Sequence, residues 1–549
     1  MANIMSSALS GLLATQRSLD TIGHNIANVN TEGYSRQRVE ITARPPEYTA
    51  LGYIGTGSSY TSVRRDYDGL VEGQLRDAGA EAGRYSSMSG VTSRVSELLG
   101  SGVNNLGAQL QSFFNSLSDV STNASSLATR TTLTSSAQTM ASRFNSLDTQ
   151  LGALDDELRT QISQSVRDVN GYTQEIATLN AKISEAYQRN PNALPNDLLD
   201  RRDLLVRKVA EKVDIQTFED ANGSISIYVG NGQPLVLGAK AVEMSATVTP
   251  DWTLISINGS NVTSGIRGGE LGGLIEARTQ GVARLRTEIG QLATAFVNAF
   301  NTQHAQGVDL NGNAGRDDVF SIGSFTTNAS APVVNVAAAP GNAGAATLSY
   351  QVNDATQLQA TDYTYTWTGS AWRVTDAYSG SEVTPPLPGI DVTIGGGAPA
   401  TGDQFMVRAA RNPAGDIPNG QLIKLNLSDA REWAAAAAGS PADSKDNQNM
   451  QALMGIAKQA GVIGGASTLD VAWASVESRI GALARGNTLA SDAATTSLKN
   501  LTDRRETTAG VNLDEEAANL LKMQQTYQAL ARAISVADNL FQSVLQAVG

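Results

Sequence analysis

The sequence contains no cysteine and only two histidines, His24 and His304. The missing thiols exclude disulfide bonds, cysteine-ligated zinc and thiol catalysis, and two histidines leave little room for acid–base catalysis near neutral pH. No apolar run approaches the roughly 18 to 20 residues that span a bilayer. No cluster of lysine and arginine precedes a short apolar core at the N-terminus, so we expect no cleaved signal peptide. These absences argue against a thiol enzyme, a disulfide scaffold and membrane insertion.

Positive charge is limited as well, and the 549 residues carry a formal net charge of −13. Binding to the phosphates of nucleic acid needs a basic face, so the composition argues against a nucleic-acid partner. A chain of this length exceeds what a single hydrophobic core supports, so we expect several domains.

The two ends of the chain are nearly free of charge. Beyond Lys522 only Arg532 and Asp538 are charged, and residues 1–31 hold only Arg17 and Asp20 as full charges. Apolar residues nevertheless recur at both ends with helical spacing. This spacing predicts an a/d seam, which consists of Leu9, Leu12, Leu19 and Ile26 at one end and Leu520, Met523, Tyr527, Leu530, Ile534, Phe541 and Val544 at the other.

A clear signal marks the start of the C-terminal helix, where Asn512 and Glu515 have the spacing of a capping box. We predict that the two terminal helices pair as an antiparallel coiled coil. Helices that are poor in charge on all sides are usually buried on all sides. We therefore expect neighbouring copies of the chain to cover the faces that this pair leaves open.

Between the ends, long helices alternate with two β-rich stretches. Apolar residues keep the helical period from Met140 to Tyr187, and "NPNALPND" at 190–197 breaks it. Further helices are predicted at about 271–303 and 467–505. Strand patterns with Asn-Gly turns occur in the first β stretch, and a hairpin with Tyr363, Tyr365 and Trp367 on one face is predicted in the second.

These patterns predict an α+β multidomain protein with an elongated, mostly helical body. The predicted domains are a terminal coiled coil at 1–45 and 506–549, a rod-like helical body at 46–213, 269–325 and 413–505, a small β subdomain at 214–268, and an inserted all-β domain at 326–412.

Motifs that carry chemistry are weak in this sequence. "DLNGNAGRDDVF" begins like a calcium loop, but Ala314 and Phe320 stand where that loop requires glycine and glutamate. A loop of Asx turns is therefore the favoured interpretation over a calcium site. His24 lies near Asn25 and Asn28 with no second metal ligand nearby, which favours a packing or capping role. We predict no catalytic residue, no cofactor site and no metal site.

The segment "SALSGLLATQRSLDTIGHNIANVNTEGYSRQRVEI" resembles the N-terminal signature of bacterial flagellar rod, hook and hook-associated proteins. In that family an apolar helix is followed by a corner, which falls here on Asn25, Asn28, Asn30, Thr31, Gly33 and Tyr34. The asparagines and Thr31 suit local side-chain turns, and Gly33 suits a positive φ. The stretch at 511–545 resembles the matching C-terminal signature. The length of the chain and the helices at 125–210 favour a junction member over the hook protein.

This resemblance implies a structural adaptor whose terminal helices line a hollow tube, packed against helices of other copies. It implies a ring of about eleven copies, with the hook protein below, a second junction protein above and an export chaperone at the C-terminal helix. It also implies export through the flagellar type III apparatus to the outside of the cell.

Three alternatives remain open. Another member of the same family, such as the hook protein, shares the signatures at the ends. A fused peptidoglycan hydrolase would need acidic residues in a cleft, and the extra module at 326–412 lacks a glutamate-centred helical domain. A membrane-active protein would need lysine or arginine on the polar face of its terminal helices, and these are scarce here.

Overall fold

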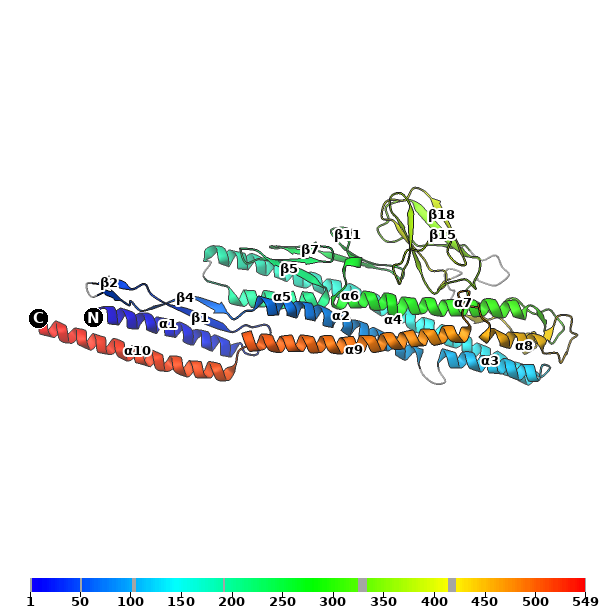
Figure 1. Cartoon of the computed structure of the whole chain (residues 1–549), viewed down its shortest axis with the longest axis horizontal. Helices are drawn as coiled ribbons and strands as arrows, with labels where there is room; N and C mark the ends of the chain where they lie inside the picture. The colour runs from blue at the N-terminus through cyan, green and yellow to red at the C-terminus, as the bar shows by residue number, and fades with distance from the viewer. Residues whose placement is uncertain are drawn as a thin grey trace.

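The computed structural model describes residues 2–49, 52–100, 105–190, 193–323, 333–412 and 421–548. The chain forms a long rod in which most helices run along the rod axis (Figure 1). Both chain ends lie at the same end of the rod, and a β domain projects from its side. The predicted α+β multidomain architecture with an elongated helical body is confirmed.

The terminal end of the rod contains α1 (Ala2–Ala27) and α10 (Leu513–Val548), which lie side by side in opposite directions (Figure 1). Asn512 caps α10, because its side-chain oxygen accepts the N–H groups of Asp514 and Glu515. The predicted pairing of the two terminal helices is therefore confirmed.

A β-hairpin that the sequence analysis does not predict packs against α1. It is built from β1 (Gln37–Ala43) paired with β4 (Ser58–Arg65), and its tip is formed by β2 (Glu47–Thr49) and β3 (Gly52–Ile54). The predicted domain boundary at residue 45 falls inside this hairpin. Gly57, with a φ of 102°, lets the hairpin approach α1 so closely that a β-carbon there would lie 2.2 Å from the Ser10 hydroxyl.

The helical body has one dominant element, the 63-residue helix α4 (Leu127–Arg189). Ser126 caps its start, and one stripe of buried residues, including Met140, Phe144, Leu151 and Leu158, follows the helical period. At 1.5 Å per residue this helix is about 95 Å long. Against it pack α2 (Gly69–Leu99), α3 (Leu106–Thr122) and α5 (Asn196–Lys212), while α9 (Leu469–Ala509) packs along α2 and α8 (Gln448–Gly455) packs on α3.

The helix predicted at 271–303 has an irregular middle. It consists of α6 (Gly269–Glu276), a π-helical stretch η3 (Ala277–Ala283) and α7 (Arg284–His304). The side chains of Arg278 and Gln280 leave this π stretch to bind the two β-rich parts of the molecule. Near the end of α7, Phe113, Phe296, Phe300, Phe320 and Trp433 form an aromatic core.

The small β subdomain covers one side of α4. It contains a four-stranded sheet in the order β5-β6-β7-β8 and a three-stranded sheet in the order β11-β10-β9. The strands are β5 (Ile215–Glu219), β6 (Ile225–Val229), β7 (Gln233–Leu237), β8 (Lys240–Ala241), β9 (Met244–Val248), β10 (Thr253–Ile257) and β11 (Ser260–Asn261).

The inserted β domain has two three-stranded sheets around a separate core that includes Tyr350, Leu358, Tyr363 and Phe405. Its strands are β14 (Val334–Asn335), β15 (Ala346–Val352), β16 (Tyr363–Trp367), β17 (Trp372–Asp376), β18 (Ile390–Gly396) and β19 (Gln404–Val407). The predicted hairpin is β16/β17. The predicted boundary at 325–326 lies outside the described residues, and the one at 412–413 lies at their edge.

Short strand pairs close the base of the insertion. β13 (Phe320–Ser321) pairs with β20 (Lys424–Leu425), and β12 (Gly307–Val308) pairs with β21 (Ala436–Ala437). The two chain segments that lead into and out of the inserted domain therefore lie next to each other on the helical body.

Candidate assembly surface

The candidate surface is the pair formed by α1 and α10, together with the corner that connects it to the body. On α1 the buried side chains are small or branched, among them Ala8, Ala14 and Ile22. A β-carbon at Gly11 would lie 3.3 Å from the methyl groups of Leu530. The two helices therefore approach closely through small residues on α1.

None of the eleven predicted seam residues is fully buried in the single chain. Leu12, Leu19, Ile26, Leu520, Met523, Leu530 and Ile534 are half-buried, and Leu9, Tyr527, Phe541 and Val544 are exposed. Phe541 keeps 52% of its surface open to solvent and Leu9 keeps 51%. The pairing of α1 with α10 therefore leaves much of the seam uncovered.

Apolar exposure extends beyond the seam. Ile4, Leu13, Leu521, Val536 and Leu540 are also exposed on the same two helices. Large exposed apolar areas mark interaction sites in soluble proteins, and these two helices leave many large apolar side chains exposed. We call the exposed and half-buried apolar residues of α1 and α10 the apolar face. No helix in the described part of the chain is both long and apolar enough to cross a membrane.

Asn25 is the centre of the corner between α1 and the hairpin, and it is buried. Its side-chain nitrogen donates to the carbonyl of Gln37 at 3.0 Å and to the carboxylate of Glu516 at 3.1 Å. Its side-chain oxygen accepts from the N–H of Gln37 at 2.9 Å and from the hydroxyl of Tyr34 at 2.8 Å. An asparagine side chain has two N–H donors and two acceptor positions. All four positions of Asn25 are therefore occupied, and this side chain connects α1, the hairpin and α10.

The other corner residues build the turn around Asn25. The Thr31 hydroxyl donates to the side-chain oxygen of Asn28 at 3.2 Å, and Asn30 is exposed. Gly33 has a φ of 82°, and a β-carbon there would lie 3.0 Å from Leu204. Burial, reinforced by nearby carboxylates of which Asp197 is the strongest, raises the pKa of Tyr34 well above its ordinary value. Its hydroxyl therefore keeps the proton that it donates to Asn25.

Ion pairs hold α10 and the hairpin to the corner. Arg36 binds Glu515 at 3.0 Å and the buried Glu516 at 2.7 Å, and its backbone N–H donates to the carbonyl of Ala509 at the end of α9. Arg65 at the end of β4 binds Asp200 at 2.8 Å and Asp203 at 2.6 Å on α5. These contacts tie the terminal pair to two helices of the body.

A third ion-pair group holds α9 to the same place. Glu72 on α2 is buried and binds both Arg505 at 2.7 Å and Arg207 at 2.8 Å. Arg505 also donates to the carbonyl of Gly33 at 3.0 Å. We call the set of Arg36, Arg65, Glu72, Asp200, Arg505 and Glu516 the corner joint. Buried charges are tolerated only when they are paired in this way, so the joint fixes how the terminal helices leave the body.

Sequence reasoning finds the corner residues but misses the corner joint. It does not predict that Arg36, Arg65, Glu72, Arg505 and Glu516 contact one another at the corner. A signal was present for Arg36 and Glu516, because these two charges stand near the borders of the terminal segments that otherwise have little charge. A single sequence does not show these contacts, because the residues are far apart in the chain. Arg505 and its partner Gly33, for example, are separated by 472 residues.

The polar loop that begins at Asp309 is held by hydrogen bonds among its own residues. The carboxylate of Asp309 accepts the N–H groups of Asn311 and Asn313, both at 2.8 Å, which is the Asx-turn arrangement that the sequence favours. Within the described residues, no group of three or more histidine or acidic side chains is placed to hold a metal ion.

Known flagellar sequence profiles match four parts of this chain. Residues 5–34 match the flagella basal body rod protein, and residues 506–547 match the C-terminal part of the flagellar basal body rod FlgEFG proteins. Residues 92–320 match the helical domain of the flagellar hook-associated protein FlgK, and residues 337–409 match the D2-like domain of flagellar hook-associated protein 1. Together with the paired ends and the corner, these matches define a protein of the flagellar rod, hook and hook-associated class.

Similarity to full-length relatives identifies one family within this class. The chain is 32% identical to flagellar hook-associated protein 1 of Salmonella typhimurium and of Escherichia coli, over 99% of this chain and 100% of either relative. The chain belongs to the flagellar hook-associated protein 1 family. The Bacillus subtilis relative is 29% identical over 57% of this chain and 69% of its own length. The solved structure of the flagellar hook junction protein FlgK from Burkholderia pseudomallei has the same fold, with a TM-score of 0.67 and 22% identity over 79% of this chain and 99% of that one.

Proposed function

We propose that the chain is a structural adaptor that assembles as a ring at the distal end of the flagellar hook and joins the hook to the filament. The observation that carries this proposal is the apolar face of α1 and α10, which one copy cannot cover. The names of the closely similar relatives support the same conclusion.

The geometry supplies a physical route to the ring. Neighbouring copies bring their apolar faces together, and burying apolar surface drives the association. Since the apolar face carries few charges, little desolvation cost opposes this step. The corner joint holds the helix pair at one angle to the body, so every copy presents the same surface. A ring of about eleven copies is proposed from the family resemblance.

The proposed partners come from the family resemblance. The hook protein lies below the ring, a second junction protein lies above it, and an export chaperone covers α10 before export. The protein functions outside the cell, is exported through the flagellar type III apparatus and carries out no catalysis.

Electron microscopy of a strain that lacks the gene tests this function. We expect hooks of normal length without filaments, and filament protein released into the medium. Restoring the gene from a plasmid should restore filaments. Loss of the hook itself would instead indicate the rod or hook protein among the alternatives, and normal filaments in the deletion strain would contradict the junction role.

A further inference from the structure

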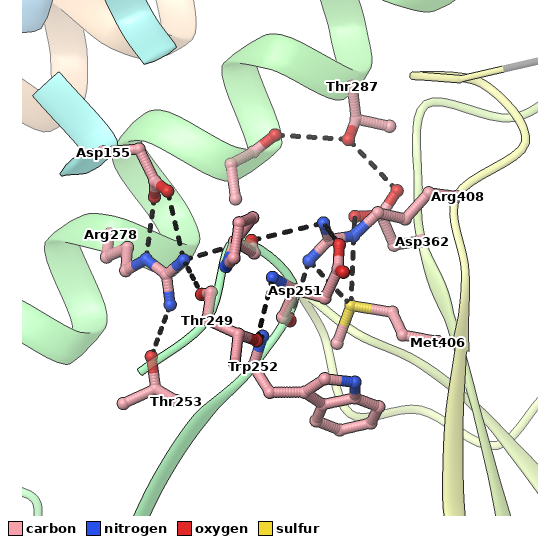
Figure 2. A network of polar contacts seen from close by, with 12 residues as sticks. Asp155, Thr249, Asp251, Trp252, Thr253, Arg278, Thr287, Asp362, Met406 and Arg408 are labelled. Carbon is pink, nitrogen blue, oxygen red and sulfur yellow. Dashed lines mark hydrogen bonds and ion pairs between the residues drawn. The ribbon is translucent and has the colours of Figure 1, made fainter. Parts of the chain in front are cut away.

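The inserted β domain is held to the body by more than its two chain connections. On α7, the hydroxyl of Thr287 donates to the carboxylate of Asp362 at 3.1 Å (Figure 2). The hydroxyl of Tyr378 donates to the other oxygen of that carboxylate at 2.9 Å, and Gln280 of the π stretch donates to the carbonyl of Tyr378 at 2.7 Å. Asp362 is buried. One side of the domain is therefore fixed to the helix that continues from η3.

A second contact joins the inserted domain to the small β subdomain. Arg408, just after β19, donates to the carboxylate of Asp251 and, at 2.8 Å, to the carbonyl of the same residue. Its Nε lies 3.5 Å from the Asp362 carboxylate, so one guanidinium connects both sides (Figure 2). Asp251 belongs to the turn at 249–252 that joins β9 to β10.

The body holds that turn from the opposite side. Arg278 of η3 binds Asp155 on α4 with two hydrogen bonds of 2.7 and 3.1 Å, and it donates to the carbonyl of Thr249 at 2.7 Å (Figure 2). The carbonyl of Pro250 accepts from Arg278 at 3.1 Å and from Arg408 at 3.3 Å. The two arginines thus meet on one peptide group of the turn.

We propose that Arg278 and Arg408 clamp the 249–252 turn from two sides and so lock the inserted β domain in one orientation relative to the helical body. The contacts form a closed path from α4 through η3, the turn, Arg408 and Asp362 back to α7. A domain attached by connectors alone is free to rotate, whereas a planar guanidinium with several fixed acceptors restrains orientation as well as distance. This inference concerns the single chain and does not depend on the assembly proposed above.

Pulsed electron paramagnetic resonance tests the clamp, because a chain without cysteine accepts labels only where cysteine is introduced. Thr160→Cys on α4 and Thr393→Cys on β18 are both at exposed positions and place one spin label on the body and one on the inserted domain. We expect one narrow distance distribution in the parent. Arg408→Met should broaden that distribution about two-fold, because the domain then loses its contact with the 249–252 turn.

Two further variants separate the clamp from other effects. Arg373→Met removes a largely exposed ion pair to Glu382 within the inserted domain and should leave the distribution narrow. Asp251→Ala acts from outside the inserted domain and should broaden it, which excludes misfolding of that domain as the cause. Near-ultraviolet circular dichroism of Trp367 and Trp372 checks its fold in every variant. A broad distribution in the parent, or a narrow one in Arg408→Met, would overturn the proposal.

Discussion

Among single residues, Ile534 gives the sharpest test of the apolar face. It is half-buried near the middle of α10, and the ring is proposed to bury it completely. An aspartate there would be a buried charge without a partner, which costs several kcal/mol in each copy. We expect Ile534→Asp to give a secreted protein with a folded body that does not join the hook. Secretion into the medium and incorporation into purified hooks are measured separately.

Two matched variants accompany this test. Ile534→Val keeps the position apolar and should assemble normally, and Arg532→Ala, two positions away, should have a mild effect. Loss of secretion without a defect in purified protein would point to the chaperone instead of the ring. An Ile534→Asp strain that grows filaments and swims like its parent would falsify the role of the apolar face.

We expect His304 to make the stability of the body depend on pH. It is completely buried, its Nε2 accepts the N–H of Ala434 at 2.9 Å, and its Nδ1 therefore carries the proton that is donated to the carbonyl of Arg316 at 2.8 Å. Burial lowers its pKa from 6.5 to about 4. Because the folded pKa lies below the unfolded value, its contribution is fully present above 6.5 and is lost as pH falls towards 4.

The expected slope is about 1.4 kcal/mol of unfolding free energy per pH unit in that window, since one proton is taken up on unfolding. Other groups titrate in the same range, so the quantity to compare is the difference between the parent and His304→Gln in urea unfolding at several pH values. The slope should be smaller in His304→Gln than in the parent. Equal slopes in the two proteins would show that His304 is not the linked group.

At the scale of secondary-structure elements, the corner joint should decide how firmly α10 is held. Glu516 is almost completely buried and paired with Arg36, whereas Glu515 binds the same arginine with 58% of its side chain exposed. Removing one partner of a buried pair costs about 3 to 5 kcal/mol, and an exposed pair contributes about 0 to 1 kcal/mol. We expect Glu516→Gln to increase hydrogen exchange along α1 and α10, and Glu515→Gln to change it little. Equal exchange in both variants would contradict this ranking.

The inserted β domain should be removable as a unit. Because β13 pairs with β20 at its base, a short Gly/Ser link can close the gap left by deleting 326–412. The deletion would expose the side chains of Thr287 and Gln280, and water would then supply their hydrogen-bond partners. We expect the strain to assemble filaments and to swim at least partly. The control strain carries the same Gly/Ser link but keeps the domain. Bare hooks in the deletion strain and not in the control would reveal an assembly contact in this domain.

The elements that sequence reasoning predicts are those whose apolar period is continuous. Buried positions such as Phe144, Leu151 and Leu158 repeat along α4, so its length and rod-like character follow from the pattern. The hairpin β1/β4 is missed because nearly all of its side chains are exposed or half-buried, and no alternation of buried and exposed residues marks its strands. The π stretch in 277–283 is missed because it changes the helical period over only seven residues. The corner was found through family resemblance, and its charged partners were not, because they are distant in the sequence.

On the scale of the whole molecule, the terminal pair should be the least stable part of a free copy. Its apolar face is uncovered, whereas the body has a continuous core along α4 and α7. Regions with few buried contacts open first. We expect limited proteolysis of a verified monomer to remove about 40 to 60 residues from each end and to leave a stable fragment of the body. Mass spectrometry of the fragments gives the cleavage sites, and equal resistance of both ends would count against this view.

The out-and-back path of the chain has a consequence for biosynthesis. Asn25 and Glu516 touch although they are 491 residues apart, so α1 must wait for its partner until nearly the whole intervening chain has been made. A chain that terminates between these two residues contains α1 but lacks both α10 and the Glu516 carboxylate that completes the corner. In the ring proposed above, the same contact would make assembly depend on the length of the polypeptide, because a prematurely terminated copy lacks the terminal pair through which copies are proposed to associate.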